Sequence, residues 1–235
     1  MMFIMPIFGT SQIPAPVRVA LGMILSVAFY GSVTPLTEAL GLADFAVAVL
    51  CQVVLGIFFG FVTQLVFMGV QFAGEIIDIQ IGFAVANILN PTTQQQVTII
   101  GELELAIATL LFLITNAYML YLQGIAGSFA LLPLPWVTLT QATELSVMTF
   151  FTQALLIVFK IATPAAITLF LVNITLAFLA RVAPQMNIFV IGFPLQITVG
   201  LIMLVFSIPL LGYALPQLFT QVPHQLDTIM RSMAG

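Results

Sequence analysis

Charged side chains are scarce in this chain of 235 residues. They make up 5% of the sequence, with four Lys and Arg against eight Asp and Glu, whereas apolar residues make up 62%. The mean hydropathy is +1.23. Because soluble domains carry about 25% charged residues, the composition excludes an ordinary soluble domain. The shortage of cations also excludes nucleic acid as a partner, since its phosphates are neutralised by Lys and Arg.

Reactive and metal-binding side chains are equally few. Cys51 is the single cysteine and His224 the single histidine, so neither an internal disulfide nor a Cys/His metal site is possible. The sequence has no HExxH zinc motif, no P-loop, no GxGxxG and no nucleophile elbow. We therefore expect no enzyme activity, no cofactor and no bound metal.

Long apolar stretches give the chain its organisation. Four of them carry no charge, and in the fifth Lys160 is the one charge before Arg181. They are Val19–Thr37, Phe45–Gly74, Leu105–Thr143, Val182–Leu226 and, with Lys160, Ser146–Val182. Because lipid offers no partner to unpaired backbone groups, such stretches predict hydrophobic helices. The predicted fold class is an all-α integral membrane protein in contact with lipid.

Prolines inside these stretches predict that the helices are broken. A helix over Ser146–Val182 would be about 55 Å long, against a hydrocarbon core of about 30 Å. Pro164 lacks the backbone N–H that would bond the Lys160 carbonyl, and Pro194 and Pro209 interrupt the next stretch in the same way. We expect short, broken helices and helical hairpins rather than straight spans.

Polar residues in the apolar stretches recur at helical spacing. Two sets share a face, namely Gln64, Gln71, Glu75 and Asp78, and then Glu102, Thr109, Asn116 and Gln123. Since an amide or carboxylate facing lipid is costly, these faces meet protein or water. They favour hydrogen bonds between helices over a line of ion or proton sites, and the wall of an aqueous conduit is a further interpretation.

A buried lysine needs a partner of opposite charge. Lys160 would cost about 2.5–3.5 kcal/mol in a membrane unless paired, and its candidate partners are Glu75, Asp78 and Glu102. With Arg181, these residues form a predicted buried ion-pair network. A structural ion pair is preferred to a transport relay.

Two further segments stand out. Asn90–Gln96 is polar but uncharged, and it is either a solvated turn or a loop that faces a water-filled lumen. Near the C-terminus, apolar residues recur every three to four positions at Leu218, Val222, Leu226, Ile229 and Met233. This pattern predicts an amphipathic helix with an Asp227–Arg231 pair on its other face. We expect the apolar face to dock on a partner rather than on a membrane surface.

Several blocks of sequence resemble one family. The most specific is Arg181–Pro194, with Arg181, Pro184, Gln185, Asn187, Gly192, Phe193 and Pro194 as its characteristic residues. Gly74–Gly82, Asn90-Pro91, Leu110–Asn116 and Pro194–Gly200 add to it. The chain resembles the FliR family of flagellar biosynthesis proteins, whose virulence-associated relatives are the SctT proteins of type III secretion. The Ile191–Pro194 version is similar to flagellar members.

The resemblance implies a non-enzymatic subunit of the flagellar protein-export gate in the bacterial inner membrane. In this family, FliR joins FliP and FliQ in a hetero-oligomer through which unfolded flagellar subunits pass, with FlhB and FlhA beside it. It implies a FliP-like part over about 1–140, a FliQ-like hairpin over about 146–215 and an amphipathic tail over 216–235. It also implies a channel plug formed by Leu89, Asn90, Pro91, Thr92, Thr93, Gln94, Gln95 and Gln96.

Three alternatives stay open. The first is a small secondary transporter with discontinuous helices near Pro164 and Pro194 and Lys160 as coupling residue, although no repeat of two similar halves is apparent. The second is the virulence-type homologue, and the third is a purely structural scaffold. Family members usually carry more residues before the equivalent of Met5, so we expect the first helix to lack part of its length.

Overall fold

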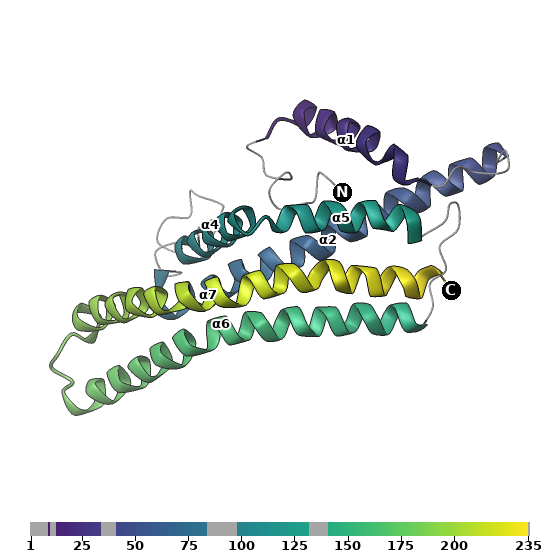
Figure 1. The fold of residues 1–235 in the computed structure, drawn as a ribbon. Helices are drawn as coiled ribbons and strands as arrows, with labels where there is room; N and C mark the ends of the chain where they lie inside the picture. Colours follow the sequence, from purple (N-terminus) through teal and green to yellow (C-terminus); the bar gives the residue numbers. More distant parts are fainter. Residues whose placement is uncertain (1–8, 10–12, 34–40, 84–97, 132–140, 235) are drawn as a thin grey trace. The chain divides into compact units, whose positions relative to one another are not determined.

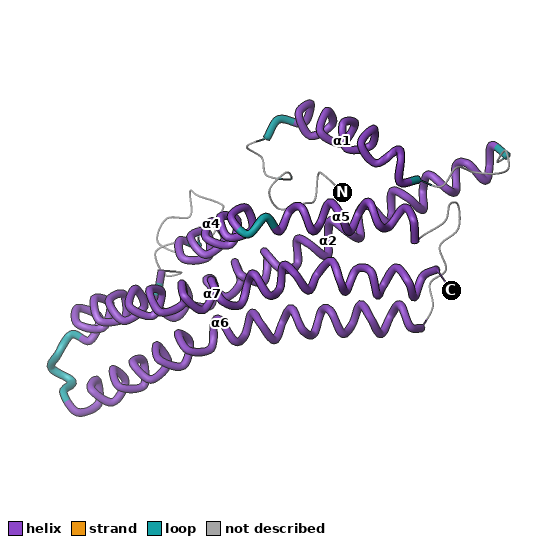
Figure 2. The backbone as a smooth tube through the Cα atoms, viewed as in Figure 1, coloured by secondary structure: helices purple, strands orange, loops and turns teal. Residues whose placement is uncertain are grey.

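The computed structural model describes residues 9, 13–33, 41–83, 98–131 and 141–234, and within these ranges the regular structure is helical throughout (Figures 1 and 2). The elements are α1 (Ala15–Phe29), the short 3-10 helix η1 (Tyr30–Ser32), α2 (Leu42–Ile81), α4 (Ile99–Ile114), α5 (Ala117–Leu131), α6 (Gln141–Val182) and α7 (Ile188–Ala234). The predicted all-α fold is confirmed.

Three of these helices are long and apolar enough to cross a membrane. They are α2 with 40 residues, α6 with 42 and most of α7, and the bent pair of α4 and α5 adds a possible fourth span. Large apolar side chains also lie on their exposed faces, such as Phe61 and Phe72 on α2 and Phe178 on α6. A helix that is apolar all round is typical of a membrane span.

The prediction that prolines interrupt these helices is wrong at the named positions. Pro164 lies inside α6, and Pro194 and Pro209 lie inside α7, so both helices continue past them (Figure 2). A proline removes one hydrogen bond, but ending the helix there would leave several more backbone groups unpaired in an apolar environment. Continuing the helix is therefore the less costly arrangement.

The helices do break between α4 and α5. Asn116 has a φ of 54°, in the left-handed region that asparagine tolerates better than most residues. Its N–H donates to the carbonyl of Leu113 at 3.1 Å, and its carbonyl accepts from the N–H of Met119 at 3.0 Å. Together with the hairpin of α6 and α7, this pair confirms the expected broken and hairpin elements.

The chain forms two compact units, each assembled from separate stretches of sequence. Unit 1 comprises Met1–Phe67, Phe112–Ala154 and Pro216–Gly235, and unit 2 comprises Met68–Leu111 and Leu155–Leu215. The division into a FliP-like part, a FliQ-like hairpin and a tail stays a prediction.

Aromatic rings form the centre of unit 1. Phe112 packs edge-on against Phe219, with ring centroids 5.0 Å apart, and against Phe67 at 5.5 Å. Phe67 also stacks on Phe219 at 5.6 Å. Tyr121 lies beside Phe112 at 5.5 Å. Edge-to-face and offset contacts of this kind add about 0.5–1.5 kcal/mol each beyond the burial of the rings.

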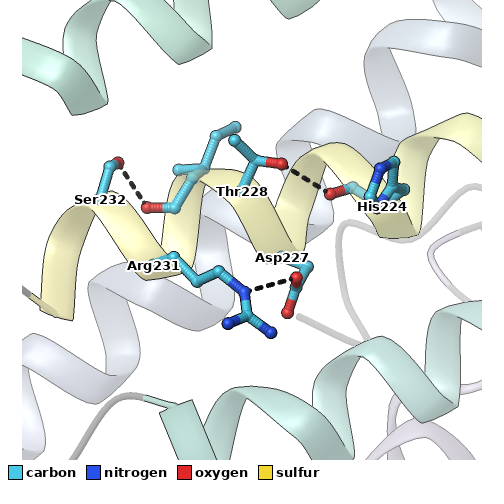
Figure 3. A network of polar contacts seen from close by, with 6 residues as sticks. His224, Asp227, Thr228, Arg231 and Ser232 are labelled. Atoms are coloured by element: carbon cyan, nitrogen blue, oxygen red, sulfur yellow. Dashed lines mark hydrogen bonds and ion pairs between the residues drawn. The ribbon is translucent and has the colours of Figure 1, made fainter.

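The C-terminal part of α7 packs on unit 1 by its predicted apolar face. Its five predicted apolar residues are each at most 5% exposed: Leu218, Val222, Leu226, Ile229 and Met233. On the other side the Nε of Arg231 donates to the Oδ2 of Asp227 at 2.8 Å (Figure 3). The amphipathic helix is thus confirmed. The expectation that its apolar face docks on a partner is wrong, because the chain itself buries that face.

Branched apolar side chains form the core of unit 2. The buried cluster joins α2, α4, α6 and α7 through Ile77, Ile81, Ile100, Ala165, Leu169 and Leu204. Polar side chains of unit 2, among them the buried Asp78 and Glu104, lie on the same helices. They are the candidate functional groups of the chain.

Candidate functional site

Asp78 binds the N-terminus of a second helix. It lies in the last turns of α2 and is 3% exposed. Its Oδ2 accepts hydrogen bonds from the N–H groups of Ile100 at 3.0 Å and Gly101 at 3.3 Å. These N–H groups belong to the first turn of α4, which has no carbonyl partners within its own helix. Asp78 therefore acts as the N-cap of α4 from 22 residues away, and the helix dipole favours its negative charge.

Two glycines make this arrangement possible. Gly74 on α2 and Gly101 on α4 are both buried, and the two backbones meet there. A Cβ atom on Gly74 would lie 2.6 Å from the Cα of Gly101, and one on Gly101 would lie 3.0 Å from the carbonyl oxygen of Gln71. Real Cβ atoms do not approach backbone as closely as the first distance, so Gly74 requires glycine, and the second is so tight that Gly101 strongly favours it.

A third glycine ends α2. Gly82 has a φ of 93°, and its N–H donates to the carbonyls of Asp78 and Ile79, each at 3.2 Å. This is the left-handed conformation that commonly terminates helices and that glycine adopts without strain. Asp78 and Gly82 thus define where the chain leaves α2, and Asp78 also defines where it enters α4.

Three amide side chains join α2, α6 and α7 in unit 2. The Nδ2 of Asn173 donates to the Oε1 of Gln80 at 3.3 Å. The Nε2 of Gln196 in turn donates to the Oδ1 of Asn173. Each amide offers a donor and an acceptor, so a chain of amides satisfies polar groups without adding charge. These three residues lie outside the two predicted polar faces, of which Asp78 is a member that bonds to another helix.

Sequence reasoning missed a buried carboxyl group, Glu104. It is 0% exposed, and its Oε1 lies 3.1 Å from the Oγ of Ser207 on α7. Glu102, which the sequence predicts as part of the buried ion-pair network, is exposed. The signal was the spacing of four that Glu104 shares with Ile100 and Ala108, both buried. That spacing places Glu104 on the packed face of α4.

The predicted ion-pair network does not form within the described part of this chain. Asp78 is bound by backbone N–H groups instead of by a cation. Glu75 is half-buried, while Glu102, Lys160 and Arg181 are exposed. Within this single chain Lys160 has no described ion-pair partner, and its side chain is exposed on α6. Whether a partner subunit pairs with it stays a prediction.

The characteristic residues of the Arg181–Pro194 block form the turn between α6 and α7. Arg181 lies in the last turn of α6, which ends at Val182. Pro184, Gln185 and Asn187 lie in the connection, and α7 begins at Ile188. Within this turn the N–H of Met186 donates to the carbonyl of Ala183, and that of Val190 to Asn187, both at 3.0 Å.

The block continues into the first turns of α7, where two of its residues contact neighbouring helices. A Cβ atom on Gly192 would lie 3.3 Å from Leu176 of α6, and one on Gly82 would lie 3.1 Å from the ring of Phe193. Gly192 is buried, whereas Phe193 and Pro194 are exposed. The block therefore fixes how α7 starts against α6 and the end of α2.

The predicted plug residues, Leu89 to Gln96, lie outside the described residues. The described residues nearest to them are Phe83 on one side and Thr98 on the other. Among the residues that the structure covers, no group of three or more His, Cys, Asp or Glu side chains could hold a metal ion.

These features define a helical membrane protein whose buried polar groups bind its own helices to one another. A family model described as "Bacterial export proteins, family 1" matches residues 1–222. The chain is 30% identical over 203 residues to flagellar biosynthetic protein FliR of Bacillus subtilis, covering 85% of this chain and 78% of that protein. It is 29% identical to FliR of Escherichia coli, covering 97% and 87%. The chain belongs to this family of bacterial export proteins.

A virulence-associated relative matches a smaller part. Yop proteins translocation protein T of Yersinia pestis is 30% identical over 158 residues, covering 66% of this chain and 60% of that protein. The expected resemblance to the FliR family and to its virulence relatives is thereby confirmed.

The crossing of α2 and α4 makes one prediction. Gly74→Ala introduces a methyl group into backbone that has no room for it, so we expect a loss of roughly 1–3 kcal/mol in the free energy of unfolding. The matched control is Gly127→Ala in α5, where nothing lies within 4 Å of the added atom. There the change should be neutral or stabilising by up to about 1 kcal/mol. Circular dichroism during unfolding of the purified variants in detergent measures the free energy of unfolding of each. Equal stabilities of Gly74→Ala and Gly127→Ala would contradict the close approach of α2 and α4.

Proposed function

We propose that this protein is a non-enzymatic core subunit of the flagellar type III protein-export gate in the bacterial inner membrane. The observation that carries the proposal is the family model, which matches residues 1–222. The FliR relatives support a component of a flagellar or type III export apparatus. The three long apolar helices support its place in a membrane.

The exposed apolar surface needs other molecules to cover it, and the resemblance to the FliR family implies which proteins these are. On α6 and α7, large side chains such as Phe170, Phe178 and Phe206 are each more than half exposed. Apolar surface of this extent requires lipid or other protein. We assign it to lipid and to FliP and FliQ, which form with this subunit the channel for unfolded flagellar subunits, with FlhB and FlhA beside it.

The segment from Leu89 to Gln96 is proposed as part of the channel plug. Uncharged amides and hydroxyls suit a surface that cargo of either charge passes. Its support in the structure is indirect: Gly82 ends α2 before the segment, and Asp78 caps α4 after it. The described residues that flank it, Phe83 and Thr98, both belong to unit 2.

The flagellar gate is preferred to the alternatives. The FliR relative of Escherichia coli matches 97% of this chain, against 66% for the virulence relative. The transporter alternative relied on Lys160 as a coupling residue, and Lys160 is exposed and forms no ion pair within the described part of the chain. No observation favours a scaffold without a channel.

Co-expression tests the assignment of partners. The chain is produced alone, with FliP, with FliQ and with both, then extracted in mild detergent and weighed by native mass spectrometry. Because the exposed apolar surface needs protein to cover it, we expect a defined hetero-oligomer only when the partners are present. A stable monomer or homodimer that binds neither FliP nor FliQ on co-expression would contradict the proposal and favour the transporter.

The plug assignment has its own test. Deletion of Thr92–Gln95 in an assembled gate should raise the conductance of the membrane to small ions, because the segment no longer fills the channel. A control that changes Gln94, Gln95 and Gln96 to Asn keeps both the length and the uncharged character, so it should leave conductance unchanged. An assembled deletion variant with the conductance of the wild type would rule the plug out.

A further inference from the structure

Glu104 occupies an unusual position for an acidic side chain. It projects from α4 toward α7 within unit 2 and is 0% exposed. Its Oε1 lies 3.1 Å from the Oγ of Ser207, while its Oε2 is buried and accepts no hydrogen bond from the described residues. An ionised carboxylate has about four acceptor positions, and here a single hydroxyl group is within reach.

The hydroxyl of Ser207 is already committed. Its Oγ donates to the carbonyl of Leu204, one turn earlier in α7, at 2.8 Å. A serine hydroxyl carries one proton, so it cannot donate fully to Leu204 and to Glu104 at the same time. Both contacts are full hydrogen bonds only if Glu104 is protonated and its O–H donates a hydrogen bond to the Oγ of Ser207.

The surrounding charges give Glu104 no counter-ion. The cations of unit 2 are Lys160 and Arg181, and both are exposed. Asp78 is the acidic group that acts on Glu104 electrostatically from α2. Its oxygens accept backbone N–H groups at the start of α4, which offset part of the cost of burying a negative charge on Asp78. Ionisation of Glu104 would therefore place a negative charge without a counter-ion in the apolar interior of the unit.

The remaining acidic groups of unit 2 lie nearer its surface. Glu102, on the same helix as Glu104, is exposed, and Glu75 on α2 is half-buried. Neither can neutralise an ionised Glu104, because both are acids themselves. The described residues of α6 and α7 in this unit contribute no acidic side chain.

We propose that Glu104 is a proton-binding site, in which the neutral carboxylic acid donates a hydrogen bond to Ser207 and thereby joins α4 to α7. The resulting chain of hydrogen bonds runs from Glu104 through Ser207 to the carbonyl of Leu204, with each hydroxyl donating once. Removal of the proton leaves a buried charge with at most one donor, which is a costly arrangement in an apolar interior. The contact between α4 and α7 therefore depends on the occupancy of this site.

Infrared spectroscopy of the full chain in lipid nanodiscs at neutral pH tests the proposal. A protonated carboxylic acid has a carbonyl stretching band that a carboxylate lacks. We expect such a band in the wild type, its loss in Glu104→Gln and its retention in the matched control Glu102→Gln, which alters an exposed acid two residues away. Absence of the band from the wild type, or its survival in Glu104→Gln, would overturn the proposal.

A second variant keeps the test decisive if Glu104→Gln does not fold. Ser207→Ala leaves the acid in place but removes the hydroxyl that accepts its hydrogen bond. Because the hydroxyl of the acid then has a weaker partner, the carbonyl band should move to higher frequency rather than disappear. A band that stays at the same frequency in Ser207→Ala belongs to another residue and would contradict the assignment to Glu104.

Discussion

The binding of Asp78 to the first turn of α4 is the interaction on which unit 2 depends. It satisfies two buried backbone N–H groups that α4 cannot satisfy itself, and it does so from another helix. The distance is short only because Gly74 and Gly101 let the two backbones meet. The buried cluster around Ile77, Ile81 and Ile100 then packs beside this crossing. Without the carboxylate, the first turn of α4 would bury unpaired N–H groups, each costing about 1–3 kcal/mol.

The two buried acids of unit 2 show how local donors decide charge in an apolar protein. Asp78 meets backbone N–H groups and a helix N-terminus, which favour a negative charge against the cost of its burial. Glu104 meets one hydroxyl that already donates elsewhere, so the neutral acid fits better. The polar groups of Gln80, Asn173 and Gln196 are also used between helices, and large apolar side chains such as Phe170, Phe178 and Phe206 lie on the outward faces. Such faces suit a subunit that lipid and other subunits of an export gate enclose.

Composition and periodicity were sufficient to predict the all-α class, the apolar helices and the amphipathic end of α7. Leu218 to Met233 repeat at a spacing that only a helix satisfies, and that face is buried. Other features were beyond local reasoning. Pro164 forbids one hydrogen bond but does not decide whether the helix resumes, since the cost of stopping depends on the apolar surroundings. The spacing of four groups Glu104 with Ile100 and Ala108, but only the structure shows that this face of α4 meets α7. The capping of α4 by Asp78 spans 22 residues.

Amide hydrogen exchange at the start of α4 tests the central role of Asp78 most directly. The account predicts that Asp78→Ala speeds exchange at Ile100 and Gly101, because their N–H groups lose their acceptor, while the middle of α5 keeps its protection. The control Asp44→Ala changes an exposed acid at the other end of α2 and should leave both regions as in the wild type. Unchanged protection at Ile100 and Gly101 in Asp78→Ala would contradict the account.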